Sequence, residues 1–269
     1  MKKYFFLAGL PRSGSTLLTC LLNQNPEIYC SNESPMCDLL YRTERYFAES
    51  IGFNSSQNEE GHINVCNSLV SNYYSCKSQP YIIDKFRSWG TPDNLNLIRK
   101  YITDDVKIIC PVRSINEILA SFIKLFRYHS DRQNFVDHNI VNNGRFIYRS
   151  IDDVRCDELM IPNGPIDSAL FAMSQYNMPE NRGVFHFVEY DDLITSPKET
   201  MDGIYNFLGL HTYQHNFDNI QQSTEINHNY HNLPTMHVVR DTLKKKSTPP
   251  EDILSPYIIN KYKDYEFWR

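Results

Sequence analysis

Short apolar runs alternate along the chain with longer segments in which apolar residues recur every three or four positions. The short runs are typical of buried strands, and the recurring pattern is typical of helices with one buried face. Strands are expected at 3–9, 27–30, 81–84, 106–112 and 183–190. Helices are expected at 15–24, 34–47, 60–75, 91–102, 114–126, 167–177, 196–210 and 248–262. This alternation predicts an α/β fold with a parallel sheet flanked by helices, and ligands at the carboxyl ends of the strands.

Local signals refine this picture at a few positions. Ser114 and Glu117 have the spacing of a capping box at the start of a helix. The Asn-rich stretch 130–147 predicts no clear element, and the alternation of strands and helices ends after about residue 211. We therefore expect one domain over 1–269, in which 211–269 forms loops and a final helix that cover the ligand site.

Composition narrows the class of protein. The 269 residues carry a formal net charge of -5, with 41% hydrophobic and 22% charged residues, as in an ordinary globular domain. Nucleic-acid-binding proteins usually have a strong basic excess, so no nucleic-acid partner is expected and any anion site must be local. The seven cysteines are an odd number without C-x-x-C pairs, which favours a reducing compartment over a disulfide framework.

The N-terminal stretch "MKKYFFLAGL" imitates a secretory signal, with two lysines before an apolar run. The run is short and enters a glycine loop without a small-residue cleavage site, so a buried strand is the better interpretation. No stretch approaches the roughly 20 apolar residues that span a bilayer. A cytoplasmic location without a membrane span is expected.

The loop "LAGLPRSGSTLL" at 8–19 follows the first expected strand and leads into a helix. Gly9 and Gly14 have the spacing of a phosphate-binding P-loop, but Ser15 stands where the lysine of an ATPase would be. Backbone N–H groups at a helix start form an anion site, and Arg12 adds a cation. A metal-free anion site is therefore favoured over a magnesium-dependent P-loop kinase. A simple glycine turn with an exposed arginine is the structural alternative.

A second candidate anion element is "CPVRSINEILASF" at 110–122. Arg113 stands between an expected strand and a helix cap, and two helical turns bring Ser121 back toward the same end. Taken alone, this pattern also describes an ordinary capped helix.

The two elements together resemble the sulfotransferases that use 3'-phosphoadenosine 5'-phosphosulfate (PAPS), which implies a three-layer fold like that of P-loop NTPases. The resemblance implies that the first loop holds the 5'-phosphosulfate and that Arg113 and Ser121 bind the 3'-phosphate. The loop residues concerned are Arg12, Ser13, Gly14, Ser15 and Thr16. An arginine after the proline resembles tyrosylprotein sulfotransferases and related bacterial and carbohydrate-type enzymes.

The same resemblance assigns catalytic roles. Glu33, just past the second expected strand, is positioned to take a proton from an acceptor hydroxyl. Lys85 follows the third strand and, with Arg12, would offset negative charge in the transition state, while Asp84 is expected to orient Lys85. Asn32 stands where tyrosylprotein sulfotransferases often have a second glutamate, so a peptide acceptor is not implied. A solvated Glu33 and a surface Lys85 are the alternatives.

The C-terminal third adds weaker candidates. The family closes its donor site with a late basic segment, which points to Ser223 and Arg240. Lys244, Lys245 and Lys246 read as a solvated charge run. No Asp or Cys at ligand spacing accompanies the histidines of this region, so no metal site is expected. These histidines are His228, His231 and His237.

The resulting hypothesis is transfer of a sulfuryl group from PAPS to a hydroxyl-bearing acceptor, such as a sugar, a tyrosine or a small alcohol, without a metal ion. The other product is adenosine 3',5'-bisphosphate. A P-loop nucleotide kinase and a non-catalytic nucleotide-binding module are the rival hypotheses. The sequence leaves the acceptor and the oligomeric state open.

Overall fold

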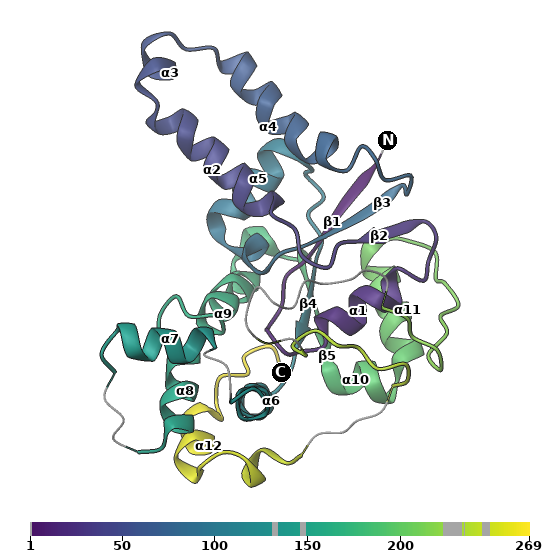
Figure 1. The fold of residues 1–269 in the computed structure, drawn as a ribbon. Helices are drawn as coiled ribbons and strands as arrows, with labels where there is room; N and C mark the ends of the chain where they lie inside the picture. The colour runs from purple at the N-terminus through teal and green to yellow at the C-terminus, as the bar shows by residue number, and fades with distance from the viewer. Residues whose placement is uncertain (1, 131–133, 146–148, 223–232, 234, 244–247) are drawn as a thin grey trace.

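The computed structural model describes residues 2–130, 134–145, 149–222, 233, 235–243 and 248–269. Within these residues, five parallel strands form one sheet in the order β2-β3-β1-β4-β5 (Figure 1). Their bounds are β1 Lys3–Leu7, β2 Ile28–Cys30, β3 Tyr81–Lys85, β4 Ile108–Val112 and β5 Phe185–Glu189. Because all strands are parallel, their carboxyl ends meet at one edge of the sheet.

Helices cover both faces of the sheet. The helices that precede β5 along the chain are α1 Ser15–Leu22, α2 Met36–Glu49, α3 Ile51–Ser55, α4 Glu59–Tyr73, α5 Pro92–Tyr101, α6 Ile115–Tyr128, α7 Phe135–Asn142, α8 Ile151–Leu159 and α9 Asp167–Ser174. After β5 follow α10 Tyr190–Thr195, α11 Pro197–Leu208 and α12 Pro256–Tyr262. Within the described residues, no helix combines the length and the apolarity that crossing a bilayer requires.

Side chains alternate between two hydrophobic clusters because neighbouring residues of a strand point to opposite faces. Phe6 and Ile108 belong to a cluster with residues of α5, α6, α8 and α9, whereas Phe5 and Ile109 belong to a cluster with residues of α1 and α11. The sheet is therefore the middle of three layers, and the predicted three-layer α/β fold is confirmed.

Several local predictions need correction. The first strand ends at Leu7 and not at residue 9. The helix expected at 248–262 is divided into a short 3₁₀ turn at Pro250–Asp252 and α12, which begins at Pro256 and is capped by the Ser255 hydroxyl. The capping box at Ser114 is absent, since the Ser114 side chain makes no cap hydrogen bond. Two helices, α7 and α8, lie in or just after the stretch that showed no clear pattern.

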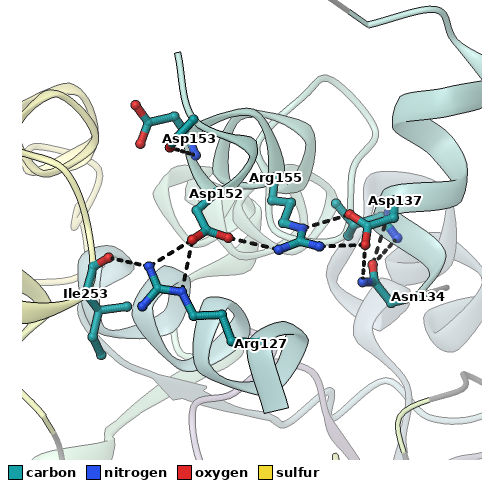
Figure 2. A network of polar contacts seen from close by, with 9 residues as sticks. Arg127, Asn134, Asp137, Asp152, Asp153, Arg155 and Ile253 are labelled. Carbon is teal, nitrogen blue, oxygen red and sulfur yellow. Dashed lines mark hydrogen bonds and ion pairs between the residues drawn. The ribbon is translucent and has the colours of Figure 1, made fainter. Parts of the chain in front are cut away.

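A polar network joins α6, α7 and α8 (Figure 2). The guanidinium of Arg155 donates twice to Asp137, with both distances 2.7 Å, and once to Asp152 at 2.9 Å. Asp152 also accepts from Arg127, which reaches the Ile253 carbonyl at 3.3 Å. These bonds hold the two weakly amphipathic helices against α6, whose side chains line the cavity described next.

The helices α2, α3 and α4 form an arm that projects away from the sheet, at the upper left of Figure 1. The arm begins just after residues 31–34, which follow β2. Its helices pack on α5 at the base through a small cluster that includes Leu40, Cys66 and Tyr101.

Candidate functional site

A cavity of about 620 Å³ opens at the carboxyl ends of β1, β3 and β4. Among the residues predicted from the sequence, it is lined by Arg12, Gly14, Ser15, Thr16, Glu33, Lys85, Arg113, Ser121 and Arg240. Ser13 is buried within the loop and does not line the cavity, and Ser223 lies outside the described residues, as do Lys244, Lys245 and Lys246. The structure thus brings nearly all predicted site residues to one place, although they come from distant parts of the sequence.

The loop after β1 turns sharply into α1. Arg12 and Gly14 both have positive φ, of 60° and 84°, and α1 begins at Ser15. A left-handed conformation is uncommon for arginine and is typical of constrained functional loops. The buried Ser13 hydroxyl donates to the Leu10 carbonyl at 2.6 Å and stabilises the turn. The resulting helix start offers backbone N–H groups to an anion.

Gly9 and Gly14 are required by close packing. A Cβ at Gly9 would lie 2.3 Å from the carbonyl oxygen of Pro111, where β1 passes β4. A Cβ at Gly14 would lie 2.7 Å from Cδ2 of Tyr190. The phosphate-loop spacing in the sequence therefore reflects two different steric needs, one toward the sheet and one toward the start of α10.

The Arg12 side chain extends across the cavity to the second predicted anion element. Its Nε donates to Ser121 Oγ at 3.2 Å, and its Nη1 donates to the Met236 carbonyl. Burial, and secondly the charge of Arg113, lowers the pKa of Arg12 from its ordinary value, while Tyr190 opposes this. Two like charges held this close favour binding of an anion between them.

Arg113 follows β4 and is fixed by three contacts. Its Nε donates to Glu117 Oε2 at 3.1 Å, and its Nη1 donates to the Arg12 carbonyl at 3.4 Å. Its guanidinium carbon lies 4.4 Å from the centre of the Tyr190 ring. Glu117 therefore orients Arg113 instead of capping α6, which corrects the capping-box prediction. The first loop and the "CPVRS" element are in direct contact.

Glu33 and Lys85 are brought together by hydrogen bonds of the Lys85 backbone. The backbone N–H of Lys85 donates to Ser31 Oγ at 2.8 Å, and the N–H of Ser34 donates to the Lys85 carbonyl at 3.1 Å. The connection that carries Glu33 is thereby fastened to the end of β3. Burial lowers the pKa of Lys85, and the neighbouring Cys30 and Glu33 act in the opposite direction.

Asp84 has a different role from the one predicted. Its buried carboxylate accepts from the Tyr74 hydroxyl at 2.5 Å and from Trp89 Nε1 at 2.7 Å. Because neighbouring strand residues face opposite ways, Asp84 is directed to the face of the sheet that carries Trp89 and α5, and Lys85 to the opposite face. Asp84 thus anchors the turn after β3 and not the Lys85 ammonium.

Sequence reasoning did not identify several cavity residues. Arg87 lines the cavity from the 3₁₀ helix Arg87–Gly90, and its charge acts on Lys85. Lys124 stands one turn after Ser121 on α6 and donates to Thr248 Oγ1 at 2.9 Å. The i, i+3 spacing from Ser121 is a signal that could have found Lys124.

The C-terminal segment contributes one wall of the cavity. His237 Nδ1 lies 3.4 Å from Thr16 Oγ1, and Arg240 lines the cavity while remaining exposed. His237 therefore lies beside the anion loop. His228 and His231 lie outside the described residues.

Comparisons with known proteins agree with this geometry. A model of the sulfotransferase family matches residues 5–214. The sulfotransferase domain from the curacin biosynthetic pathway is similar, with a TM-score of 0.55 at 13% identity and 97% of each chain covered. Mouse sulfotransferase SULT7A1, complexed with PAP, has a TM-score of 0.53 at 13% identity, with 98% of this chain and 83% of that chain covered. A comparison with curated protein sequences found no significant match.

At such low identity the two solved structures establish a shared fold, whereas the family match spans most of the sheet and both anion elements. The predicted membership and sulfuryl-transfer activity are thereby confirmed. This chain belongs to the sulfotransferase family and is a transferase of sulfuryl groups.

Proposed function

We propose that this sulfotransferase uses PAPS as its donor and transfers the sulfuryl group to an acceptor hydroxyl. The observation that supports this most directly is the contact between the two anion elements. Arg12 donates to Ser121, and Arg113 donates to the Arg12 carbonyl. An anionic nucleotide with phosphate groups at both its 3' and 5' positions fits two adjacent anion sites. The mouse neighbour complexed with PAP has the same fold and supports the assignment.

The charges around the cavity suit such a donor. Among the residues that the structure describes, six cationic side chains line it, against the carboxylates of Glu33 and Glu117, and Glu117 is already paired with Arg113. These cations are Arg12, Lys85, Arg87, Arg113, Lys124 and Arg240. Side-chain cations can therefore offset the donor's negative charge, and the proposal does not require a metal ion.

We assign the donor-binding residues as follows. The loop from Arg12 to Thr16 would hold the 5'-phosphosulfate, with Ser13 contributing its backbone because its hydroxyl is bonded to Leu10. Arg113 and Ser121 would hold the 3'-phosphate. Arg240, and Ser223 outside the described residues, would complete the donor site from the C-terminal segment.

The bound donor supplies an electrophilic sulfuryl group. In this proposal the Glu33 carboxylate accepts the proton of the acceptor hydroxyl. Lys85 and Arg12 keep positive charge next to the oxygen atoms that become more negative during transfer. Lys85 serves this purpose because its backbone is bonded to both Ser31 and Ser34, which fixes it beside Glu33.

Donor identity is tested by thermal shift. Adenosine 3',5'-bisphosphate is compared with ADP plus magnesium, since a ligand that binds only the folded protein raises the melting temperature. We expect a shift with the bisphosphate alone. A shift with ADP and magnesium alone would contradict the donor assignment and favour a kinase.

The catalytic assignment is tested by substitution. Glu33→Gln and Lys85→Met should keep bisphosphate binding but lower transfer from labelled PAPS to a panel of sugars, phenolic peptides and alcohols by on the order of 100-fold or more. Glu49→Gln and Lys198→Met, both exposed, are matched controls that should transfer normally. Turnover at the normal rate in both site variants would show that the assigned roles are wrong.

A further inference from the structure

A second group of reactive side chains lies in the projecting arm. Glu44 on α2 and His62 on α4 approach each other with Oε2 and Nε2 2.6 Å apart, and Cys66 Sγ lies 3.9 Å from the same oxygen. The three candidate ligand atoms all lie within 4.8 Å of one another. None of these residues lines the cavity that holds Glu33 and Lys85.

Helix geometry explains why these groups converge. His62 and Cys66 are four residues apart on α4, so they share one face, and that face packs on α2. Cys66 is fully buried in the small cluster with Leu40 and Tyr101, and its sulfur also approaches a carboxylate oxygen. The Phe47 ring lies 4.2 Å from the His62 ring, centre to centre, and limits its rotation.

Residues of α5 surround the group. Lys100 Nζ donates to Glu44 Oε1 at 2.9 Å, and the Tyr101 hydroxyl donates to Oε2 at 2.7 Å. The lysine thus leaves one carboxylate oxygen turned toward His62 and Cys66. The Tyr101 hydroxyl also lies 3.5 Å from His62 Nε2, so a fourth oxygen donor is within reach of the same point.

We propose that Glu44, His62 and Cys66 form a binding site for Zn²⁺, with a water molecule or the Tyr101 hydroxyl as the fourth ligand. One carboxylate, one imidazole and one thiolate match the preference of zinc for four mixed N, O and S ligands. Mg²⁺ and Ca²⁺ prefer oxygen ligands alone and do not match this group. Partial exposure of Glu44 and His62 leaves a path for the ion to enter.

Binding requires a defined exchange of protons. The Cys66 thiol loses its proton to solvent when its sulfur binds the ion, and the proton shared between His62 Nε2 and Glu44 is displaced by the metal. Lys100 remains on the other oxygen of Glu44 and keeps it oriented. The ion would tie α2 to α4 within the arm and would stabilise the helix that begins shortly after Glu33.

The experiment uses the full chain, freed of metal with a chelator. It is titrated with Zn²⁺ in the presence of a chromophoric chelator, whose absorbance reports how much Zn²⁺ the protein binds. Titration with Co²⁺ reports thiolate ligation directly through its charge-transfer absorption. We expect one ion per chain, a thiolate–cobalt band and a higher melting temperature with Zn²⁺. Cys66→Ser should abolish the band, and His62→Phe, which preserves stacking on Phe47, should weaken Zn²⁺ binding at least about tenfold.

Cys76→Ser is the matched control, because Cys76 is exposed in the turn after α4 and should not affect binding. Circular dichroism of each metal-free variant shows whether it is folded. The proposal is overturned if the wild-type chain binds no Zn²⁺ or shows no thiolate–cobalt band. It is also overturned if folded Cys66→Ser binds as tightly as wild type, since the group would then be a hydrogen-bonded contact between helices.

Discussion

Replacing Gly14 with alanine tests whether the anion loop depends on its packing against Tyr190. Gly14 has a φ of 84°, and the left-handed conformation costs an L-residue about 1–2 kcal/mol. The new Cβ would also lie 2.7 Å from Tyr190 Cδ2, so the ring must move. Overpacking of this kind typically costs about 1–3 kcal/mol more. The Arg113 guanidinium lies over the Tyr190 ring, so movement of the ring should also displace Arg113 in the second anion element.

Gly209 provides a matched control. It has a φ of 67°, and a Cβ there would meet nothing within 4 Å. Gly209→Ala therefore carries the backbone cost alone, and both variants share the same gain from a less flexible unfolded chain. The free energy of unfolding is measured by urea denaturation, and the affinity for adenosine 3',5'-bisphosphate by calorimetry. We expect Gly14→Ala to lose about 1–3 kcal/mol more stability than Gly209→Ala, and only Gly14→Ala to bind the nucleotide more weakly. Equal stability losses with unchanged binding would refute the steric reasoning.

Two further predictions concern stability. Burial lowers the pKa of His215 to about 4, with the Leu21 backbone and Asp202 only partly opposing this, so its neutral form stabilises the fold above the ordinary pKa of 6.5. That stability is lost as pH falls from 6.5 toward 4, by about 2 kcal/mol of unfolding free energy between pH 7 and 5. In urea denaturation at several pH values, His215→Phe should lose about that much less stability over this range than wild type. An equal loss in both proteins would contradict the prediction. Arg155→Lys removes a two-point bond to a carboxylate (Figure 2) and should cost about 1–2 kcal/mol of unfolding free energy. Arg42→Lys, at an exposed pair, should cost under about 0.5 kcal/mol by the same denaturation assay, and equal losses would remove the distinction.

The strands were predictable because their apolar runs are short and continuous, as a sheet covered on both faces requires. The helices α7 and α8 were not found, since polar residues interrupt their apolar positions. Their starts do carry local signals. Asn134 Oδ1 accepts from two backbone N–H groups at the start of α7, and Ser150 Oγ accepts from the Asp153 N–H in α8. The Arg155 network supplies tertiary support that no local pattern reveals.

The placement of the site was largely predictable because its residues follow strands, and the carboxyl ends of parallel strands meet. Lys85 is the last residue of β3, Arg113 directly follows β4 and Arg12 lies in the loop after β1, and all three line the same cavity. Arg87 was not found, because it lies on a 3₁₀ turn whose direction depends on the buried Asp84 carboxylate holding Trp89. The position of a side chain that is fixed by contacts between distant residues cannot be predicted from the spacing of residues along the sequence.

The order of the strands has a consequence for biosynthesis. β1 lies in the middle of the sheet, and its neighbours β3 and β4 come about 75 or more residues later, as the pairing of Lys3 with Tyr81 shows. On the ribosome, β1 has no strand to pair with until residues 81–85 have emerged. Such non-local pairing slows folding and exposes the nascent chain to aggregation. Chaperones that bind nascent chains should therefore affect the yield of folded enzyme more than the activity of the enzyme once it has folded.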